Sequence, residues 1–378
     1  MHFDPVMKIK EQSILAAAKQ LRPTATVVRQ ANGKIRVERE DLLTESERKD
    51  RIAVSQMAGK LRKGLPETRI EKSAQEFPVV SGIVYEYDNA WTSILSTDHK
   101  DVILNTMELP SSIRVVTFNV WFSEYEWETR LEALVSFLSE RDTIVCLQEV
   151  TPRFLSLLMK QPSIQGRYRI LASVAPGSWY GLAMLVDKTS LPVPCIETIQ
   201  LYTKMGRTAL IAHFLSPACH GPLAIGTVHL ESLDSRAIRS QQLQSIQKVL
   251  SYNDNAASLL VGDMNITVTG PWADLEENKQ LLTTNLSGFI DCWEELHDVT
   301  EDDGMTFDTT TNAMLAAHTR FADSSRYDRA LFRSGASNAW KVKSMRIVGK
   351  DPIGKDSSGN SIWISDHFGL SVELAAEN

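Results

Sequence analysis

The spacing of hydrophobic and polar residues differs between the two parts of the chain. In residues 8–21 and 44–61 the apolar positions recur at helical intervals, and a proline follows each segment, so two amphipathic helices are predicted. Residues 77–95 alternate apolar and polar side chains, which predicts short strands. Residues 1–110 are therefore expected to form a small N-terminal α+β accessory region, whose role the sequence does not disclose.

From residue 111 onward, short apolar runs typical of strands are separated by helical segments and longer loops. Most of these runs end in a polar or acidic residue, which predicts two packed sheets with the chemistry gathered at one rim. Residues 111–378 are expected to form one catalytic domain. Strands are predicted at residues 113–118, 143–147, 181–186, 208–214, 223–228, 258–261 and 329–332, and helices at residues 129–140, 236–251 and 274–285.

Composition narrows the class of protein. The 378 residues are 43% hydrophobic and 23% charged, which suffices for a large core and excludes a disordered or fibrous chain. The four cysteines are scattered without a C-x-x-C pair, so neither a disulfide framework nor a zinc site is indicated. The chain begins without a basic and apolar leader, and no run approaches the roughly eighteen apolar residues of a membrane span. We expect an intracellular protein, nuclear or cytoplasmic, that is neither secreted nor bound to a membrane.

The distribution of charge argues against a nonspecific nucleic-acid binder. The formal net charge is −7, whereas neutralising phosphates requires clustered Lys and Arg. Residues 1–110 hold 17 of the 40 basic and 16 of the 47 acidic side chains, which leaves 23 basic and 31 acidic side chains in the rest. The acidic excess therefore lies in the catalytic region, where a metal site built from carboxylates accounts for part of it.

Several predicted strands end in side chains that can bind a metal ion or handle a proton. Oxygen ligands together with imidazoles describe a Mg²⁺ or Mn²⁺ site better than a zinc site. Asp263 and Asn265 stand on alternate residues of an extended segment, so both point to one face, where they can hold one attacking water. Taken singly, each such residue is more often a turn or helix cap. The set consists of Asn119, Glu149, His229, Asp263 and Asn265, with Asp366 and His367 just before the last strand.

These segments resemble the ordered motifs of the endonuclease/exonuclease/phosphatase superfamily. The motifs are Asn119 at a strand end, Leu147-Gln148-Glu149-Val150, Gly262-Asp263-x-Asn265 and Ser365-Asp366-His367. The resemblance covers about residues 114–374. It implies an α/β fold, a four-layered α/β sandwich with two central, mostly antiparallel β-sheets flanked by helices.

Further segments are similar to the type 2 tyrosyl-DNA phosphodiesterases within that superfamily. They are His229-Leu230-Glu231-Ser232 (family H-L-E-S), Thr306-Phe307-Asp308-Thr309 (T-W-D-T), the run Arg326-Tyr327-Asp328-Arg329-Ala330-Leu331-Phe332-Arg333 (R-F-D-R-I-x-F-R) and Asp366-His367-Phe368-Gly369-Leu370 (D-H-W-G-L). Two positions depart from the pattern, because Thr267 replaces an Arg and Phe307 replaces a Trp. The loss of the Arg removes a phosphate or DNA contact and leaves the identity of the adduct open.

The resemblance implies a Mg²⁺-dependent enzyme, with Mn²⁺ as the other metal, that hydrolyses the bond between a tyrosyl side chain and the 5′-phosphate of a nucleic-acid end. The expected partner is a nucleic-acid 5′ end with a covalent tyrosyl or peptide adduct, and the protein is expected to be a monomer. The implied roles are Glu149 and Asp366 as metal ligands, Asn119 completing the metal and phosphate shell, Asp263 and Asn265 positioning the water, His229 and His367 donating to phosphate oxygens, Asp328 orienting His367, and Ser232 and Phe307 contacting the substrate.

Two other functions stay open at this point. A less selective metal-dependent nuclease, or a phosphatase acting on a small phosphoester, would use the same chemistry, and Thr267 in place of the family Arg keeps this alternative alive. An inactive binding module is the other alternative. The intact set of Glu149, Asp263, Asn265 and His367 speaks against it.

Overall fold

The computed structural model describes most of the second part of the chain and short stretches of the first. The chain divides into two compact units, Met1–Thr68 and Arg69–Asn378. No helix among the described residues is long and apolar enough to cross a membrane. The described residues are 26–29, 35–38, 79–81, 83–95, 108–138, 142–173, 179–214, 221–254, 256–267, 273–319, 323–336 and 338–377.

In the first unit, two short strands form a sheet of their own. β1 (Thr26–Arg29) pairs antiparallel with β2 (Ile35–Glu38). The helices predicted over residues 8–21 and 44–61 lie outside the described residues.

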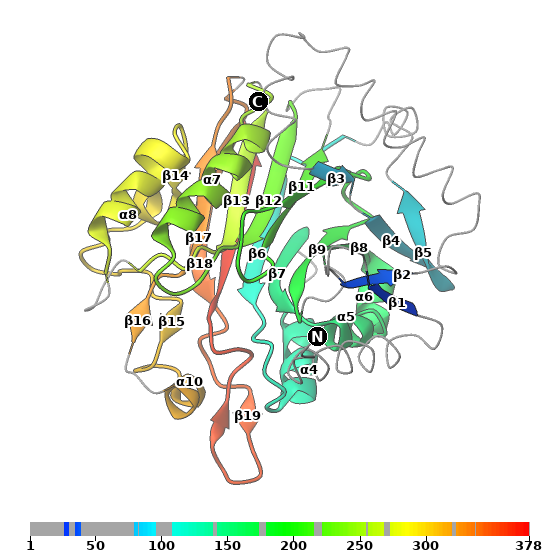
Figure 1. Ribbon diagram of the computed structural model, residues 1–378. Helices are drawn as coiled ribbons and strands as arrows, with labels where there is room; N and C mark the ends of the chain where they lie inside the picture. The colour runs from blue at the N-terminus through cyan, green and yellow to red at the C-terminus, as the bar shows by residue number, and fades with distance from the viewer. Residues whose placement is uncertain are drawn as a thin grey trace, which may run out of the picture. The chain divides into compact units, whose positions relative to one another are not determined.

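Two large sheets form the second unit (Figure 1). One has eight strands in the order β18-β21-β6-β7-β9-β8-β4-β5, and the other has seven in the order β14-β17-β13-β12-β11-β10-β3. Only β6 with β7 and β12 with β13 run parallel among the described pairs, which confirms two mostly antiparallel sheets. The eight strands are β4 (Ile83–Asp88), β5 (Ala90–Leu95), β6 (Ser112–Asn119), β7 (Ile144–Val150), β8 (Tyr168–Ser173), β9 (Gly181–Asp187), β18 (Trp340–Val348) and β21 (Gly369–Ala376). The seven are β3 (Val79–Ser81), β10 (Cys195–Gln200), β11 (Thr208–Phe214), β12 (Leu223–His229), β13 (Ala257–Asp263), β14 (Ile290–Asp291) and β17 (Asp328–Arg333).

Helices cover the outer face of each sheet (Figure 1). Against the eight-stranded sheet, Phe118 of β6 shares a hydrophobic cluster with Leu134 of α4. Against the seven-stranded sheet, Leu260 of β13 does the same with Ile246 of α7. The four-layered α/β sandwich is thereby confirmed. The helices on the first side are α4 (Trp127–Phe137), α5 (Pro152–Leu158) and α6 (Pro162–Arg167), and those on the second are α7 (Arg236–Leu250) and α8 (Leu275–Gln280), which continues as the π-helix η1 (Leu281–Asn285).

A third hydrophobic cluster fills the space between the sheets. It joins Val115 and Met184 from one sheet to Ile225 and Leu259 from the other. Because the central strands are covered on both faces, they are apolar along their whole length, and β13 is buried at every residue. This is why such strands stand out in the sequence as continuous apolar runs.

The structure also contains elements that the hydrophobic pattern did not predict. β18 lies at a sheet edge and exposes several of its nine residues, so its pattern is mixed. α5 and α6 are short helices that each begin with a proline, a residue that favours the first helical turn. The remaining small elements are α9 (Cys292–Leu296), α10 (Ala313–His318), and the strand pairs β15 (Phe307–Asp308) with β16 (Ser324–Ser325) and β19 (Gly354–Lys355) with β20 (Ser361–Ile362).

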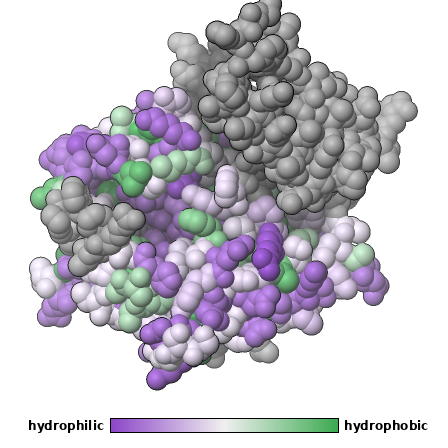
Figure 2. All heavy atoms as spheres, turned by 60° about the horizontal axis from the view of Figure 1, so that its bottom comes forward, coloured by the Kyte–Doolittle hydropathy of each residue, from purple (hydrophilic) through white to green (hydrophobic). Residues whose placement is uncertain are grey.

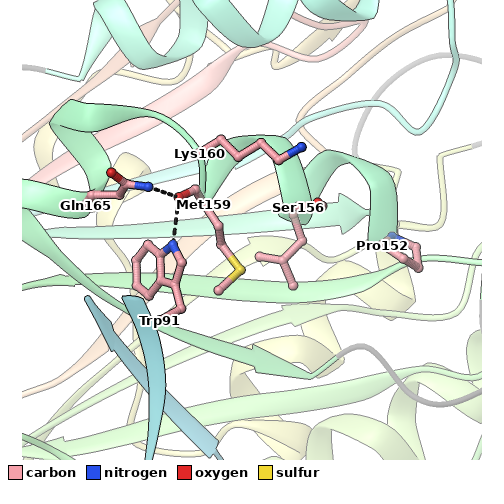
Figure 3. A pocket seen from close by; sticks show the side chains of 7 residues that line it. Trp91, Pro152, Ser156, Met159, Lys160 and Gln165 are labelled. Carbon is pink, nitrogen blue, oxygen red and sulfur yellow. Dashed lines mark hydrogen bonds between the residues drawn. The ribbon is translucent and has the colours of Figure 1, made fainter. Parts of the chain in front are cut away.

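The strands predicted within residues 77–95 belong to the two large sheets. β3 pairs with β10, and β4 pairs with β8. The indole Nε1 of Trp91 donates to the Met159 carbonyl oxygen at 2.7 Å, and Gln165 Nε2 donates to the same oxygen at 2.9 Å (Figure 3). A surface hollow of about 410 Å³ lies there, lined mainly by apolar atoms, and none of the expected site residues lines it. The division expected between residues 110 and 111 stays a proposal, which truncation tests.

Candidate active site

The two parallel strand pairs bring the polar strand ends to one edge of the sandwich. The pairing sets Asn119 beside Gln148 and His229 beside Asp263. β17 begins at the same edge, where Asp328 lies beside Asp263. Carboxyl ends of parallel strands collect functional groups because the loops that follow them share one side of the sheet. The small elements β15, β16, α10 and β19 lie on this side, at the bottom of Figure 1, and Figure 2, which turns that side forward, shows mainly hydrophilic residues with small hydrophobic patches among them.

Asp263 is the centre of the cluster. Its Oδ2 accepts a hydrogen bond from Asn119 Nδ2 at 3.1 Å, which joins the two sheets, and lies 3.4 Å from His229 Nε2. Its Oδ1 accepts from the backbone N–H of Asn265 at 2.9 Å. Three of the predicted residues are therefore brought together around the buried carboxylate of a fourth, Asp263.

The backbone beside Asp263 requires a glycine. Gly262 has φ +129°, and a Cβ placed there would lie 2.1 Å from the Val228 carbonyl oxygen. The tight turn then leads to Asn265, which has φ +51° and whose Nδ2 donates to the Leu230 carbonyl oxygen at 3.1 Å. The amide of Asn265 is thus fixed at the rim by the backbone of the neighbouring strand end.

Glu149 stands at an irregularity in β7. The register of β7 against β9 shifts between Leu147 and Val150, and Glu149 has φ +60°. Its Oε2 accepts from the backbone N–H of Phe122 at 3.0 Å, and its Oε1 lies 3.9 Å from His229 Nδ1. Burial raises the pKa of Glu149 to about 7, and the negative charge of Asp366 adds to this rise.

Asp366 faces the same space from the loop before β21. Its Oδ1 accepts from Ser365 Oγ at 3.1 Å, and the same hydroxyl lies 2.6 Å from the Asn119 carbonyl oxygen. Burial raises the pKa of Asp366, and the charge of Asp263 opposes its ionisation as well. Two largely buried carboxyl groups therefore repel each other across the site.

This pair suits a hard cation. No group of three or more His, Cys, Asp and Glu side chains placed to hold a metal occurs within the part of the chain that the structure describes. Glu149 and Asp366 nevertheless offer oxygen ligands whose mutual repulsion a divalent cation would relieve. Mg²⁺ commonly takes one or two protein carboxylates and fills its other positions with water and phosphate oxygens, so the residues fit it.

His367 is held by Asp328. Its Nδ1 donates to Asp328 Oδ2 at 2.8 Å, and the backbone N–H of Asp328 donates to Thr306 Oγ1 at 3.0 Å. Burial alone would lower the pKa of His367, but the Asp328 carboxylate, together with the charges of Asp366 and Asp263, outweighs it and raises the pKa to about 10. The Phe307 ring meets the imidazole edge to face, with ring centroids 5.0 Å apart. Asp328, expected to orient His367, and Phe307, expected to contact the substrate, thus both lie against the imidazole.

His229 is in the opposite electrostatic situation, because it is buried and lies beside Arg207, a residue that sequence reasoning missed. Arg207 Nη1 lies 3.1 Å from His229 Nδ1. A guanidinium can only donate, so Nδ1 accepts and the imidazole proton resides on Nε2, facing Asp263. Burial lowers the pKa of His229 to about 3, and Arg207 adds to the lowering while Asp263 opposes it. One imidazole is therefore neutral and the other, His367, is charged at neutral pH.

Arg207 also organises the aromatic side of the site. Its Nη1 donates to the Tyr180 hydroxyl at 3.0 Å, and its guanidinium carbon lies 5.3 Å from the centroid of that ring. Ser232 lies on this side too, where its hydroxyl contacts Met205 Sδ at 3.2 Å. No described hydrogen bond joins Ser232 to Glu149, Asp263 or His367, so the structure does not bring Ser232 into the cluster itself.

Arg130 of α4 is the second cation that the sequence reasoning missed. Its guanidinium is buried and donates to the backbone carbonyl oxygens of the loop after β6 and of Ile364. Burial lowers the pKa of Arg130 to about 10, while the charges of Asp366 and Glu149 oppose this lowering. A signal existed, because Arg130 precedes the buried Leu131 and sits on the apolar face of an amphipathic segment. The loop carbonyls bonded to it are those of Val120, Trp121, Ser123 and Tyr125.

Comparison with known proteins agrees with this geometry. The model of the Endonuclease/Exonuclease/phosphatase family matches residues 116–367. Among solved structures, D. rerio TDP2 complexed with single strand DNA product is 22% identical with a TM-score of 0.56, covering 70% of this chain and 99% of that chain. Truncated Caenorhabditis elegans TDP2 is 23% identical with a TM-score of 0.55, covering 70% of this chain and 98% of that chain. The human Nocturnin catalytic domain with bound sulfate is 16% identical with a TM-score of 0.51, covering 71% of this chain and 94% of that chain. At these identities the likeness shows the fold, and no curated protein matches the chain by sequence.

Proposed function

The chain belongs to the endonuclease/exonuclease/phosphatase family, and from this premise we propose that it is a Mg²⁺- or Mn²⁺-dependent phosphodiesterase that cuts between a tyrosyl side chain and the 5′-phosphate of a nucleic-acid end. The observation that carries the proposal is the buried Asp263 carboxylate, which lies 3.4 Å from the neutral imidazole of His229 and interacts electrostatically with the charged imidazole of His367. Pairs of titratable groups with opposite pKa shifts are typical of acid–base sites. The motifs that resemble type 2 tyrosyl-DNA phosphodiesterases supply the substrate class.

In the proposed mechanism, Asp263 and Asn265 orient a water for in-line attack on the phosphorus. The imidazolium of His367, held by Asp328, donates to an oxygen that gains charge in the transition state. The Nε2–H of His229 donates within the same space. A divalent cation held by Glu149 and Asp366, with Asn119 at its margin, would neutralise charge on the scissile phosphate.

The leaving group is proposed to depart toward Arg207 and Tyr180. A phenol has a pKa near about 10, so a tyrosyl leaving group needs little help from a general acid. A guanidinium that faces it stabilises the developing phenolate electrostatically. D. rerio TDP2 has been solved with a single-strand DNA product, which supports a nucleic-acid end as the other side of the substrate.

The choice of substrate distinguishes the proposed function from the alternative of a less selective nuclease or phosphatase. Purified protein with Mg²⁺ is assayed on a single strand carrying a 5′-phosphotyrosine, an abasic duplex and an inositol phosphate. We expect release of tyrosine from the first and slow or no reaction with the others. Preferred cleavage of the abasic duplex or the inositol phosphate would replace the proposed substrate by that of a general nuclease or a phosphatase, and no turnover of any substrate would favour an inactive binding module.

The role of Asp263 is tested by Asp263→Asn, which keeps the shape and the hydrogen bond from the Asn265 N–H but removes the charge and the Oδ2 acceptor of the Asn119 amide. We expect kcat to fall by at least about two orders of magnitude, as is typical for loss of a general acid–base group, with KM nearly unchanged. Asp298→Asn, at a solvent-exposed carboxylate outside the site, is the matched control. A wild-type kcat in Asp263→Asn, or a loss explained by unfolding at the assay temperature, would make Asp263 a structural cap.

A further inference from the structure

Four exposed hydrophobic residues are linked to Arg207, either through contacts or as chain neighbours of Tyr180 and Ser232, which lie on this side of the site. We call Phe122, Trp179, Met205 and Leu233 the apolar rim, and their exposed fractions are 52%, 88%, 40% and 80%. They come from four different segments, after β6, before β9, between β10 and β11, and after β12. They are four of the nine large hydrophobic residues that are exposed in the described part of the chain. Singly exposed hydrophobic residues are ordinary, but a group of them at one place marks a binding surface.

Side-chain and backbone contacts connect one half of the apolar rim, at Phe122, to the reacting centre. The ring of Phe122 stacks on that of Tyr180, with centroids 5.3 Å apart and planes 10° from parallel. Tyr180 accepts from Arg207, which reaches His229 with the same nitrogen. The backbone N–H of Phe122 meanwhile donates to Glu149. The aromatic stack therefore lies within one hydrogen bond of a residue that the proposed function gives to the metal.

The other half of the apolar rim is connected to the reacting centre through Met205. Its sulfur accepts from Arg207 Nη2 at 3.8 Å and from the hydroxyl of Ser232, the residue before Leu233. Met205, Arg207, Tyr180 and His229 line one small hollow. Arg207 thus stands between the reacting centre and an uncharged surface that continues away from it on both sides.

We propose that the apolar rim binds the polypeptide part of the adduct, that is, the residues that flank the linked tyrosine. The inference rests on the proposed function, which directs the phenol toward Arg207, so that whatever is attached to the phenol continues onto the apolar rim. A polynucleotide would need clustered cations there. The rim side chains are uncharged, and their charged neighbours Lys204 and Asp234 are of opposite sign. Apolar and aromatic side chains of a peptide are the complementary ligand.

The test compares two substrates with the same oligonucleotide. One carries 5′-phosphotyrosine as the free amino acid, and the other carries the tyrosine within a short peptide that has Leu and Phe on either side. For the wild-type chain we expect kcat/KM to be about tenfold higher for the peptide substrate. This factor corresponds to the binding free energy gained when two apolar side chains of the peptide are partly buried. In Trp179→Ser/Leu233→Ser the ratio of the two kcat/KM values should fall to near one. Leu275→Ser, at a residue 71% exposed on another element, is the matched control and should keep the wild-type ratio.

Three outcomes of this test would overturn the proposal. A wild-type ratio near one, or an undiminished ratio in Trp179→Ser/Leu233→Ser, overturns the proposal while leaving the proposed function standing. An equal fall in kcat/KM for both substrates in Trp179→Ser/Leu233→Ser assigns the apolar rim to the part that the two substrates share, the nucleic acid or the linked tyrosine, and overturns the proposal as well. Cleavage of neither substrate by the wild-type chain overturns the proposed function, and the role of the rim with it.

Discussion

The pair formed by Asp328 and His367 predicts a specific pH dependence. The carboxylate of Asp328 raises the pKa of His367 to about 10, so the imidazolium is present at neutral pH and is lost only as the pH rises through that value. Asp328→Asn keeps a hydrogen-bond acceptor for Nδ1 but removes the charge. The pKa of His367 should then fall to its ordinary value of about 6.5 or lower, because burial of the ring, the largest single influence, is opposed only by the smaller effects of the Asp366 and Asp263 charges. At pH 8 the imidazolium fraction falls from nearly complete to about 3%, so kcat should fall roughly 30-fold.

Two assays check this prediction. The titration of His367, followed by NMR in metal-free protein, should move from near pH 10 to pH 6.5 or below in Asp328→Asn. The pH profile of kcat should then decline above about pH 6.5 in the variant but not in the wild-type chain. Asp298→Asn serves as the control for a simple change of net charge. An unchanged titration, or an unchanged profile despite a shifted titration, would refute the assignment of His367 as a charged donor.

Three further predictions concern the metal pair, the turn at the centre and the domain boundary. Glu149→Gln should abolish turnover and weaken Mg²⁺ binding, which calorimetry measures. The pKa of Glu149 is raised to about 7, so the stability that this residue contributes is lost as the pH rises through that value. The metal-free variant should therefore have a higher Tm than the wild-type chain at pH 8 but not at pH 4. Gly262→Ala should lower the free energy of unfolding in urea by at least about 3 kcal/mol, since its Cβ would overlap a backbone oxygen. A chain that begins at Arg69 should keep the thermal stability of the sandwich, whereas one that begins at Ser111 should still cleave a short model substrate but melt about 10 °C lower, because it lacks β3, β4 and β5.

Much of the sandwich was predictable because its central strands are covered on both sides. β7 and β13 are continuous apolar runs, and each ends where the buried layer ends, so Glu149 and Asp263 mark the edge in the sequence itself. Strands that are only partly buried lack this signal, and β10, which lies beside the edge strand β3, was missed for that reason. Helical spacing likewise does not separate α8 from the π-helix η1, because the two differ by a single residue in hydrogen-bond spacing.

The cations of the site show where sequence reasoning ends. Arg207 follows an irregular turn, and its partners Tyr180 and His229 come from two different sheets, so no spacing connects the three residues before the chain folds. The turn itself is fixed by Thr203, whose hydroxyl donates to the buried Glu231 carboxylate at 2.6 Å and accepts from the backbone N–H of Arg207. In the sequence, Glu231 stood out only as part of the His229-Leu230-Glu231-Ser232 motif. Its contact with Thr203 gives the residue a structural role, because it fixes the turn before Arg207.

The central claim is that water attacks the phosphorus and expels the tyrosyl oxygen. The most direct measurement is mass spectrometry of both products after single-turnover cleavage of a 5′-phosphotyrosyl oligonucleotide in H₂¹⁸O with Mg²⁺. We expect unlabelled tyrosine and a 5′-phosphate that carries one ¹⁸O, with no product in the presence of EDTA. A 5′-hydroxyl end with release of phosphotyrosine, label in the tyrosine, or undiminished cleavage in EDTA would contradict it.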